Sequence, residues 1–172
     1  MKPRHFILAS AAAGIVPLQL LMARDATVDT SALEFGQLEK TPDEWRELLE
    51  PEAFHVLFKD GTEAPRSSAL NDEKREGTYI CAACYLPLFS SSTKYESGTG
   101  WPSFYESIAG RLGFSTDFKL IYPRKEYHCA RCGGHQGHIF KDGPKPTGLR
   151  YCNNGVALNF IPGGEALPEL RS

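Results

Sequence analysis

The sequence predicts an all-β domain preceded by short helices, and three observations support this fold class. From Gly61 onward, glycine, proline and serine separate short runs rich in Tyr, Ile, Phe and Val, a pattern typical of short strands joined by turns. No long helical pattern follows Phe58, which argues against alternating βαβ units. With 41% hydrophobic and 23% charged residues, the chain of 172 residues has the composition of a soluble globular protein.

Each expected element has a local reason. A helix begins after Thr41, because Thr41 can cap it, Pro42 suits the first helical position and Glu44 completes a capping box. Apolar side chains then follow on one helix face, at Trp45, Leu48 and Leu49. Pro51 ends this helix, and residues 52–58 form a second short one. The expected strands are residues 78–81, 86–89, 118–122, 138–140 and 156–161.

The start of the chain has the features of an export signal. Lys2 and Arg4 precede the uncharged run 6–23, and a basic start before an apolar stretch is what an export machine requires. A retained membrane anchor and a buried helix are the alternatives. We expect residues 1–24 to be the signal or anchor, 25–37 a linker, 38–165 one domain and 166–172 a C-terminal tail. The expected location is therefore outside the cytoplasm, in the periplasm or cell envelope.

The charge balance restricts the class of partner. The chain has 19 basic and 21 acidic residues, a net charge of −2, and no basic run, which excludes a typical nucleic-acid binder. Contact with a membrane is expected only through the N-terminal segment, if that segment is not cleaved.

Four of the five cysteines form two C-x-x-C pairs, Cys81 with Cys84 and Cys129 with Cys132. The surrounding residues repeat as well, since 79–84 and 127–132 both read Tyr-x-Cys-Ala-x-Cys. Each copy predicts a strand that runs into a tight turn and presents two sulfurs to one point. Four thiolates arranged in this way make a closed structural zinc site. Disulfides in an oxidising compartment, or a thioredoxin-like redox pair, are the alternatives.

The fifth cysteine, Cys152, is left over from these pairs. Arg150 and the amides of Asn153 and Asn154 make its sequence neighbourhood polar and electropositive, which predicts a lowered pKa for the thiol and a reactive thiolate. The alternative is a small buried hydrophobic residue, because free cysteine is often used in that way.

Histidines and aromatic residues add to this candidate site. His135 and His138 lie upstream and could form a Cys/His catalytic pair, or could be ordinary loop residues or metal ligands. Trp101 lies in a glycine-flanked turn and could anchor the loop, or could form an apolar pocket with Phe140 beside a reactive thiol.

Taken together, residues 41–161 resemble the B-type methionine sulfoxide reductases, the peptide-methionine (R)-S-oxide reductases. Several motifs in the same order carry this resemblance: residues 61–63, the two C-x-x-C pairs, 94–95, 100–104, 137–140, 142–144 and 146–152. The resemblance implies a mainly β fold, with two antiparallel sheets in a small β-barrel-like domain, short N-terminal helices and a structural Zn²⁺ at one end. It also implies an enzyme that reduces the R epimer of methionine sulfoxide, protein-bound or free, and so repairs oxidised proteins.

The resemblance implies a role for each candidate residue. Cys152 matches the nucleophile that attacks the sulfoxide sulfur, and His138 and His135 match the groups that polarise or protonate the leaving oxygen. The pocket for the substrate methyl group would consist of Trp101, His138 and Phe140. The residues that order the site around the sulfur would be Asn154 and Arg150.

The product on the enzyme would be a Cys152 sulfenic acid, which has to be reduced. Many family members carry a resolving cysteine in the turn before the tryptophan, where this chain has Thr99. The expected reductant is therefore external, either a thioredoxin-like protein or a small thiol. Two other functions are compatible with these residues: a non-catalytic zinc-binding interaction module of the same fold, and a redox sensor that forms sulfenic acid without reducing a substrate.

Overall fold

The computed structural model of the chain describes residues 35–117 and 124–172. The predicted signal or anchor at residues 1–24, most of the linker at 25–37 and the predicted strand at 118–122 lie outside the described residues. None of the helices in the described ranges is long and apolar enough to cross a bilayer.

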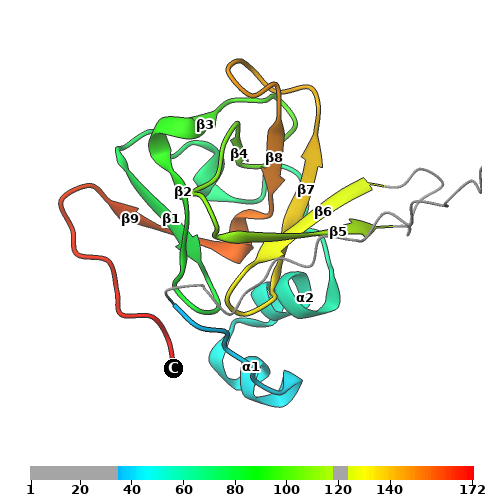
Figure 1. The fold of residues 1–172 in the computed structure, drawn as a ribbon, viewed down its shortest axis with the longest axis vertical. Helices are drawn as coiled ribbons and strands as arrows, with labels where there is room; N and C mark the ends of the chain where they lie inside the picture. Colours follow the sequence, from blue (N-terminus) through cyan, green and yellow to red (C-terminus); the bar gives the residue numbers. More distant parts are fainter. Residues whose placement is uncertain (1–34, 118–123) are drawn as a thin grey trace, which may run out of the picture.

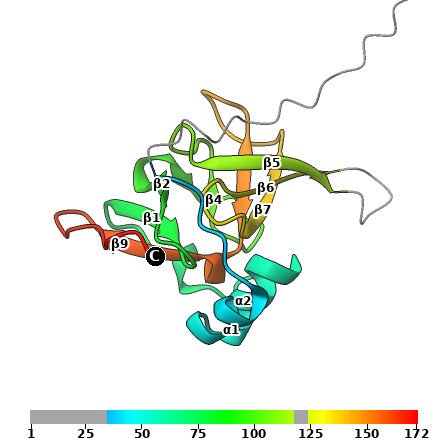
Figure 2. The ribbon, with the colours of Figure 1, turned by 60° about the horizontal axis from the view of Figure 1, so that its bottom comes forward.

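Two short helices lie together at one end of the molecule (Figures 1 and 2). The first, α1 (Pro42–Leu48), has the predicted capping box, in which the Thr41 hydroxyl accepts from the Glu44 amide and the Glu44 carboxylate accepts from the Thr41 amide. The second, α2 (Pro51–Lys59), begins at Pro51, so this proline starts a helix as well as ending the previous one. Trp45 of α1 stacks on Phe58 of α2 with ring centroids 4.8 Å apart, which holds the pair together.

The rest of the domain consists of two antiparallel sheets, as predicted. A three-stranded sheet has the order β2-β1-β9, and a six-stranded sheet has the order β3-β4-β8-β7-β6-β5. The strands of the small sheet are β1 (Gly77–Cys81), β2 (Pro87–Ser90) and β9 (Leu158–Pro162). The strands of the large sheet are β3 (Lys94–Tyr95), β4 (Ser103–Phe104), β5 (Leu112–Asp117), β6 (Arg124–Cys129), β7 (His135–Phe140) and β8 (Arg150–Asn153). Single 3₁₀ turns lie at η2 (Ala69–Asn71), η3 (Ser91–Thr93) and η4 (Gly155–Ala157).

The predicted strands agree with the structure in part. Residues 78–81, 86–89 and 138–140 fall within or at the edge of β1, β2 and β7. The run 156–161 begins two residues too early, because Val156 and Ala157 belong to the turn η4 that precedes β9. No strand was expected at β3, β4, β5 or β8, and β8 reads Arg-Tyr-Cys-Asn, which lacks an alternating apolar pattern.

Aromatic rings fill the space between the two sheets. Phe89 of the small sheet stacks on Phe104 of the large sheet with centroids 4.2 Å apart, and Tyr79 meets Phe104 edge-on at 4.9 Å. Tyr127 and Tyr151 pack edge-on at 5.4 Å. Each fully buried aromatic side chain contributes about 1.5–3 kcal/mol, so this cluster is a main source of stability. Since Tyr151 points inward, strand alternation turns its neighbour Cys152 to the outer face of the sheet.

A β-bulge in β7 changes which side chains reach that outer face. Tyr127 of β6 pairs with Gly137, but the next residue, His128, pairs with His135, so Gln136 is the extra residue. Gln136 is fully buried in the interior. The bulge also brings His135 beside His138, with ring centroids 5.3 Å apart, although residues three apart in a regular strand lie on opposite faces.

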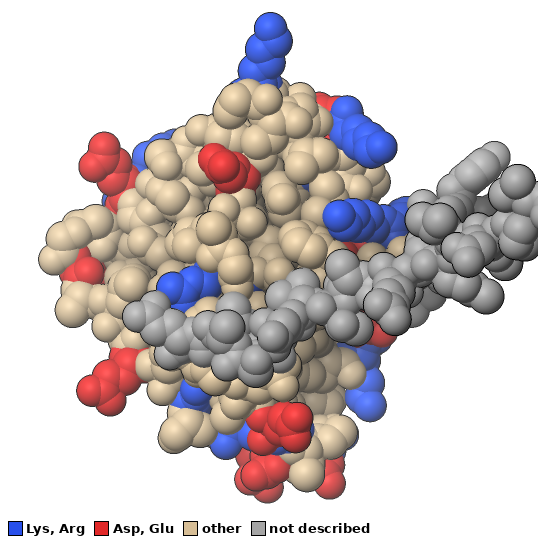
Figure 3. All heavy atoms as spheres, viewed as in Figure 1, with Lys and Arg blue, Asp and Glu red and all other residues tan. Residues whose placement is uncertain are grey.

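The surface is mixed in charge on the face shown in Figure 3. Acidic and basic side chains are interspersed there, and neither sign gathers into a continuous block.

Candidate active site and metal cluster

The four paired cysteines converge on one point. Their sulfur atoms all lie within 4.8 Å of one another, with 3.7 Å between Cys81 and Cys132 and 3.5 Å between Cys84 and Cys129. A tetrahedral ion with metal–sulfur bonds of about 2.3 Å needs sulfurs roughly 3.8 Å apart, so this cluster fits a metal ion. No disulfide joins any of the five cysteines, all of which lie in the described ranges.

The two turns that carry these sulfurs have the same backbone geometry. The amide of Tyr85 donates to the carbonyl of Cys81 at 2.9 Å, and the amide of Gly133 donates to the carbonyl of Cys129 at 2.9 Å. Tyr85 and Gly133 both have a positive φ, of 66° and 72°. The repeated sequence therefore forms a repeated structure, as predicted, although Tyr85 holds a backbone conformation that favours glycine.

Groups around the cluster hold the turns in place. Gln136 donates to the sulfur of Cys81 at 3.5 Å, and the amide of Arg171 donates to the carbonyl of Cys84 at 3.2 Å. The Arg171 guanidinium also lies 4.5 Å from the centre of the Tyr85 ring. The predicted C-terminal tail at 166–172 thus packs on the metal cluster. Hydrogen bonds with neighbouring thiols hold the pKa of Cys84 well below its usual range, which favours the metal-binding thiolate.

Cys152 lies in the middle of the large sheet, between β4 and β7. Its register partner in β7 is His138, and its register partner in β4 is Ser103. Directly opposite side chains in an antiparallel pair have Cβ atoms about 4.5–5.5 Å apart on the same face. The structure therefore places the predicted nucleophile and the predicted imidazole side by side.

The close packing of β7 against β8 depends on a glycine. A Cβ atom added at Gly137 would lie 1.9 Å from the carbonyl oxygen of Cys152. Any side chain here would push β8 away, so Gly137 is required for the distance between the two strands that carry Cys152 and His138.

The pKa of the Cys152 thiol corrects one prediction. Burial raises this pKa above its ordinary value, whereas the sequence predicted that it would be lowered. The Arg150 charge does act in the predicted direction, and hydrogen bonds from Thr99 and Arg150 also favour the thiolate, but they do not outweigh burial. The sequence showed the polar neighbours of Cys152 but not the loss of solvent around the sulfur.

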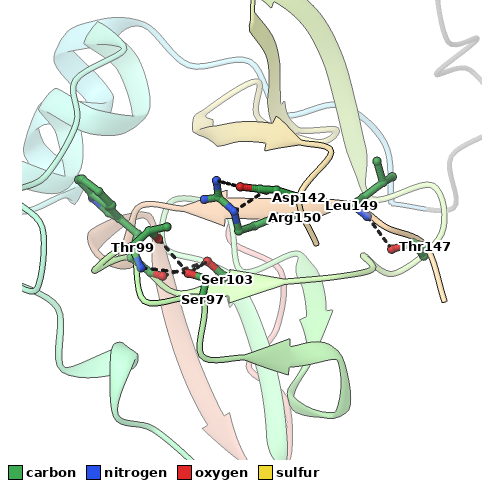
Figure 4. Close-up of polar contacts among 8 residues, drawn as sticks. Ser97, Thr99, Ser103, Asp142, Thr147, Leu149 and Arg150 are labelled. Carbon is green, nitrogen blue, oxygen red and sulfur yellow. Dashed lines mark hydrogen bonds and ion pairs between the residues drawn. The ribbon is translucent and has the colours of Figure 1, made fainter. Parts of the chain in front are cut away.

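Arg150 is held in a fixed position on the same strand. It donates to both carboxylate oxygens of Asp142, from Nε at 2.8 Å and from Nη2 at 2.9 Å (Figure 4). Its guanidinium also lies 4.2 Å from the centre of the Phe140 ring. Arg150 keeps the pKa of Asp142 below its ordinary value, so this carboxylate is ionised. The sequence alone indicates no role for Asp142, although Asp142 lies in the motif 142–144.

Thr99 belongs to a cluster of hydroxyl groups next to the thiol. Ser97 lies within 2.8 Å of both the Thr99 hydroxyl and the Ser103 hydroxyl, as Figure 4 shows. Glycines with positive φ stand on both sides of Thr99, with φ of 74° at Gly98 and 93° at Gly100. This tight loop brings the Thr99 side chain within hydrogen-bond reach of the Cys152 sulfur.

Asn153 and Asn154 do not surround the thiol in the way the sequence predicted. Both are buried. Asn154 accepts from the amide of Glu63 at 3.1 Å and donates to the carbonyl of Gln136 at 3.0 Å, while Asn153 accepts from the Tyr127 hydroxyl at 2.8 Å. Asn154 thus joins the segment that follows Cys152 to Glu63 and to β7, and the side chain of Asn153 lies in the protein interior.

Glu63 connects several parts of the site, and sequence reasoning had assigned it no role. Its buried carboxylate accepts from the amides of Gly155 and Val156 at 2.6 and 2.9 Å, just after the strand β8 that carries Cys152. Its carbonyl accepts from Nε1 of Trp101 at 3.2 Å. Burial raises the pKa of Glu63. In the sequence, the one indication of a role for Glu63 is that it lies in the motif 61–63, which is part of the family resemblance.

The predicted aromatic pocket is only partly assembled. His138 and Phe140 lie two residues apart on β7 and share its outer face, while Trp101 lies just before β4. Among the described residues, the Trp101 and Phe140 rings make no contact with each other. Phe140 instead packs against Arg150.

A free, half-buried cysteine beside an imidazole, in a β domain with a four-cysteine metal cluster, defines a cysteine-dependent redox enzyme. Comparison with known proteins gives the family. Residues 49–162 match the model of the SelR domain. The chain therefore belongs to the SelR domain family, the family of the peptide methionine sulfoxide reductases MsrB.

Similar proteins come from distant organisms. The peptide methionine sulfoxide reductase MsrB of Methanosarcina barkeri is 53% identical over 124 residues, which cover 72% of this chain and 87% of that protein. The MsrB of Pseudomonas putida W619 is 50% identical over 127 residues, covering 73% and 96%. The MsrB of Leptospira interrogans is 47% identical over 125 residues, covering 72% and 95%.

Proposed function

We infer that this chain is a peptide-methionine (R)-S-oxide reductase that reduces methionine sulfoxide in proteins or peptides, or the free amino acid. The single observation that carries this function is the register pair of Cys152 on β8 and His138 on β7. The family membership of the chain supports the same reaction.

The reductive step balances within the enzyme and its substrate. The Cys152 sulfur attacks the sulfoxide sulfur and forms a bond to it, while the bond between that sulfur and its oxygen breaks and the protonated oxygen leaves as hydroxide. Hydroxide then attacks the Cys152 sulfur, which breaks the sulfur–sulfur bond, releases methionine and leaves a sulfenic acid on Cys152. Cys152 is oxidised by two electrons and the substrate sulfur is reduced by two. The thiol proton ends on the transferred oxygen, so no external proton is consumed.

His138 is suited to carry that proton. It stands opposite Cys152 in the sheet, and imidazole takes up and releases protons near neutral pH. Because burial raises the pKa of the thiol, the resting enzyme holds the proton on sulfur until the substrate is bound. Arg150 then stabilises the negative charge that develops as the proton leaves.

Selection of the R epimer depends mainly on which hydrogen-bond donors the sulfoxide oxygen faces. Burial of the substrate methyl group against Trp101, His138 and Phe140 contributes only about 1 kcal/mol. A larger preference requires that the sulfoxide oxygen of one epimer face hydrogen-bond donors while that of the other does not. His138 and His135 are the donors in this proposal.

We assign Zn²⁺ to the four-cysteine cluster as a structural ion. All four sulfurs are needed to surround it, so no coordination position is left for a substrate. The ion would tie β1 to β6 through Cys81, Cys84, Cys129 and Cys132, and it takes no part in the reaction at Cys152. Metal analysis of protein purified without added zinc should give about one equivalent, and less than half an equivalent would contradict the assignment.

The sulfenic acid on Cys152 is returned to the thiol by an external reductant. If the four cluster cysteines bind metal, no second thiol of the chain is free to form a disulfide with Cys152. A thioredoxin-like protein or a small thiol therefore supplies the electrons. Trapping an intramolecular disulfide at Cys152 in the oxidised wild type would contradict this.

The location proposed for the enzyme is the periplasm or cell envelope. The basic start and the uncharged run 6–23 support export. Fractionation of cells that express the full chain tests the location, and recovery only in the cytoplasm would contradict it.

The experiment that tests the function is a turnover assay with the R and S epimers of a dabsylated methionine sulfoxide, run separately with dithiothreitol. Turnover of the R epimer alone is expected. Cys152→Ser should abolish turnover and leave metal content and thermal unfolding unchanged. Activity that survives in this variant would overturn the nucleophile assignment, and inactivity of the wild type would favour a non-catalytic module of the same fold.

A further inference from the structure

His135 is almost completely buried, yet one of its ring nitrogens has a charged partner. The side chain is 3% exposed, and its Nδ1 is hydrogen-bonded to a carboxylate oxygen of Glu126 on the neighbouring strand β6. The other carboxylate oxygen of Glu126 accepts from the Ser115 hydroxyl of β5 at 3.0 Å. Glu126 is thus fixed from two sides, and it fixes His135 in turn.

Glu126 also lies in the same cross-strand row as the reacting groups. Its register partner in β7 is His138, and the register partner of His138 in β8 is Cys152. Directly opposite residues share a face of the sheet, so the carboxylate, the imidazole and the thiol follow one another across three adjacent strands. His135 joins this row only because of the bulge at Gln136, which turns its ring toward His138.

We propose that Glu126 is a positioning residue that fixes the ring orientation and tautomer of His135 and, through it, the position of His138 beside Cys152. This proposal rests on the reductase function proposed above. A carboxylate that binds one ring nitrogen keeps the proton on that nitrogen and holds the ring in one of its two flipped orientations. The His135 ring, which meets His138 at an interplanar angle of 64° with centroids 5.3 Å apart, then limits where the His138 ring can lie.

Other charged and titratable groups surround this pair and have to be considered. Asp60, at the C-terminal cap of α2, brings a second carboxylate within 4.8 Å of the ligand atoms of Glu126 and His135. His128 of β6 is the register partner of His135. Among the residues that the structure describes, only Glu126 combines a hydrogen bond to His135 with a place opposite His138, so it is the residue to change.

The test compares three variants with the wild type. Glu126→Gln keeps the size of the side chain but removes its charge, and Glu126→Leu removes the hydrogen bond as well. Ser115→Ala is the matched control, because it removes the other hydrogen bond of the same carboxylate and leaves the bond to His135. Metal content and thermal unfolding identify any variant that fails to fold.

Two readouts separate positioning from a general effect on stability. The first is the single-turnover rate of methionine formation from the R epimer. We expect this rate to fall about tenfold in Glu126→Gln and further in Glu126→Leu, with little change in KM. The loss is smaller than the 10²–10⁴-fold loss expected when a proton donor itself is removed. The second is the ¹⁵N–¹H NMR spectrum of the His135 ring, which should show a single tautomer with the proton on Nδ1 in the wild type and in Ser115→Ala, and a mixture in Glu126→Leu.

The outcomes distinguish this proposal from the proposed function. If the wild type forms no methionine, the function fails, although the NMR result on His135 still applies. If the wild type is active and Glu126→Leu keeps the full rate, the proposal is overturned, whatever the His135 spectrum shows. A loss of rate with an unchanged His135 spectrum would overturn it as well, because Glu126 would then act in another way.

Discussion

Gln136 and Asn153 are hydrogen-bonded to each other in the protein interior, with 3.3 Å between Nδ2 of Asn153 and Oε1 of Gln136. Gln136 also donates to the sulfur of Cys81, and the Tyr127 hydroxyl donates to Asn153. A continuous chain of buried polar side chains thus runs from Cys81 of the four-cysteine cluster to Asn153, the residue that follows Cys152. Buried polar groups are costly unless paired, so these side chains depend on one another.

The first prediction concerns this buried pair. Gln136→Leu and Asn153→Val should each lower the free energy of unfolding by about 1–3 kcal/mol, because each leaves a buried partner unsatisfied. The double variant should cost less than the sum of the two, because both members of the pair are removed together. Urea unfolding of the metal-loaded proteins measures all four states. Additive single effects would show that the two side chains are not coupled.

The second prediction concerns the pH dependence of Cys152 reactivity. Alkylation by iodoacetamide requires the thiolate, and burial raises the pKa of this thiol, so the rate should rise with pH and reach its midpoint above the ~8.5 of a free cysteine. Arg150→Met should move the midpoint to still higher pH, because the Arg150 charge favours the thiolate. Cys152→Ser measures the background from the other cysteines. A wild-type midpoint below ~8.5 would contradict the burial argument.

The third prediction concerns the reductant. Because the Thr99 side chain reaches the Cys152 sulfur, Thr99→Cys should place a second thiol where it can attack the sulfenic acid. One round of reaction with the R epimer should then give an intramolecular disulfide, detected by intact mass as the loss of two hydrogens and by peptide mapping. Thr99→Ser is the control and should form none. Failure of Thr99→Cys to form the disulfide would mean that the loop does not hold residue 99 against the sulfur.

The fourth prediction concerns the C-terminal tail. The Arg171 guanidinium lies over the Tyr85 ring and donates to the Tyr85 hydroxyl, so Arg171→Ala, which removes both contacts, should loosen that turn and speed the release of zinc to a chelator. A loss of about 1 kcal/mol corresponds to roughly a fivefold faster release. Arg75→Ala, which changes an exposed arginine before the other end of β1, is the control. Equal release rates in the two variants would contradict a role for the tail.

Local chemistry made part of this structure predictable. The Thr41 capping box and Pro42 predicted α1, and the repeated Cys-x-x-Cys spacing predicted the metal cluster, because both depend on residues close together in the sequence. The place of Cys152 beside His138 followed from the family resemblance. No periodicity indicated β8, since its residues alternate between an aromatic core and a polar site and have no simple apolar pattern.

What the sequence did not predict depends on long-range packing. Glu63 and Asp142 gain their roles from partners on other segments, Asn154 and Arg150 respectively. The raised pKa of Cys152 arises from burial by the surrounding strands, and neighbouring residues in the sequence carry no measure of that burial.

Because Gln136 is the extra residue in β7, His135 and Gln136 face opposite sides of the sheet and have different roles. His135 serves the chemistry on one side of the sheet, and Gln136 serves the metal cluster on the other. Deleting one residue just before His135 would restore regular pairing and exchange the two faces, turning the amide toward the substrate and the imidazole toward the sulfurs. The length of this short segment therefore matters as much as its composition, and natural insertions or deletions here would be expected to abolish repair of oxidised methionine even when every cysteine is kept.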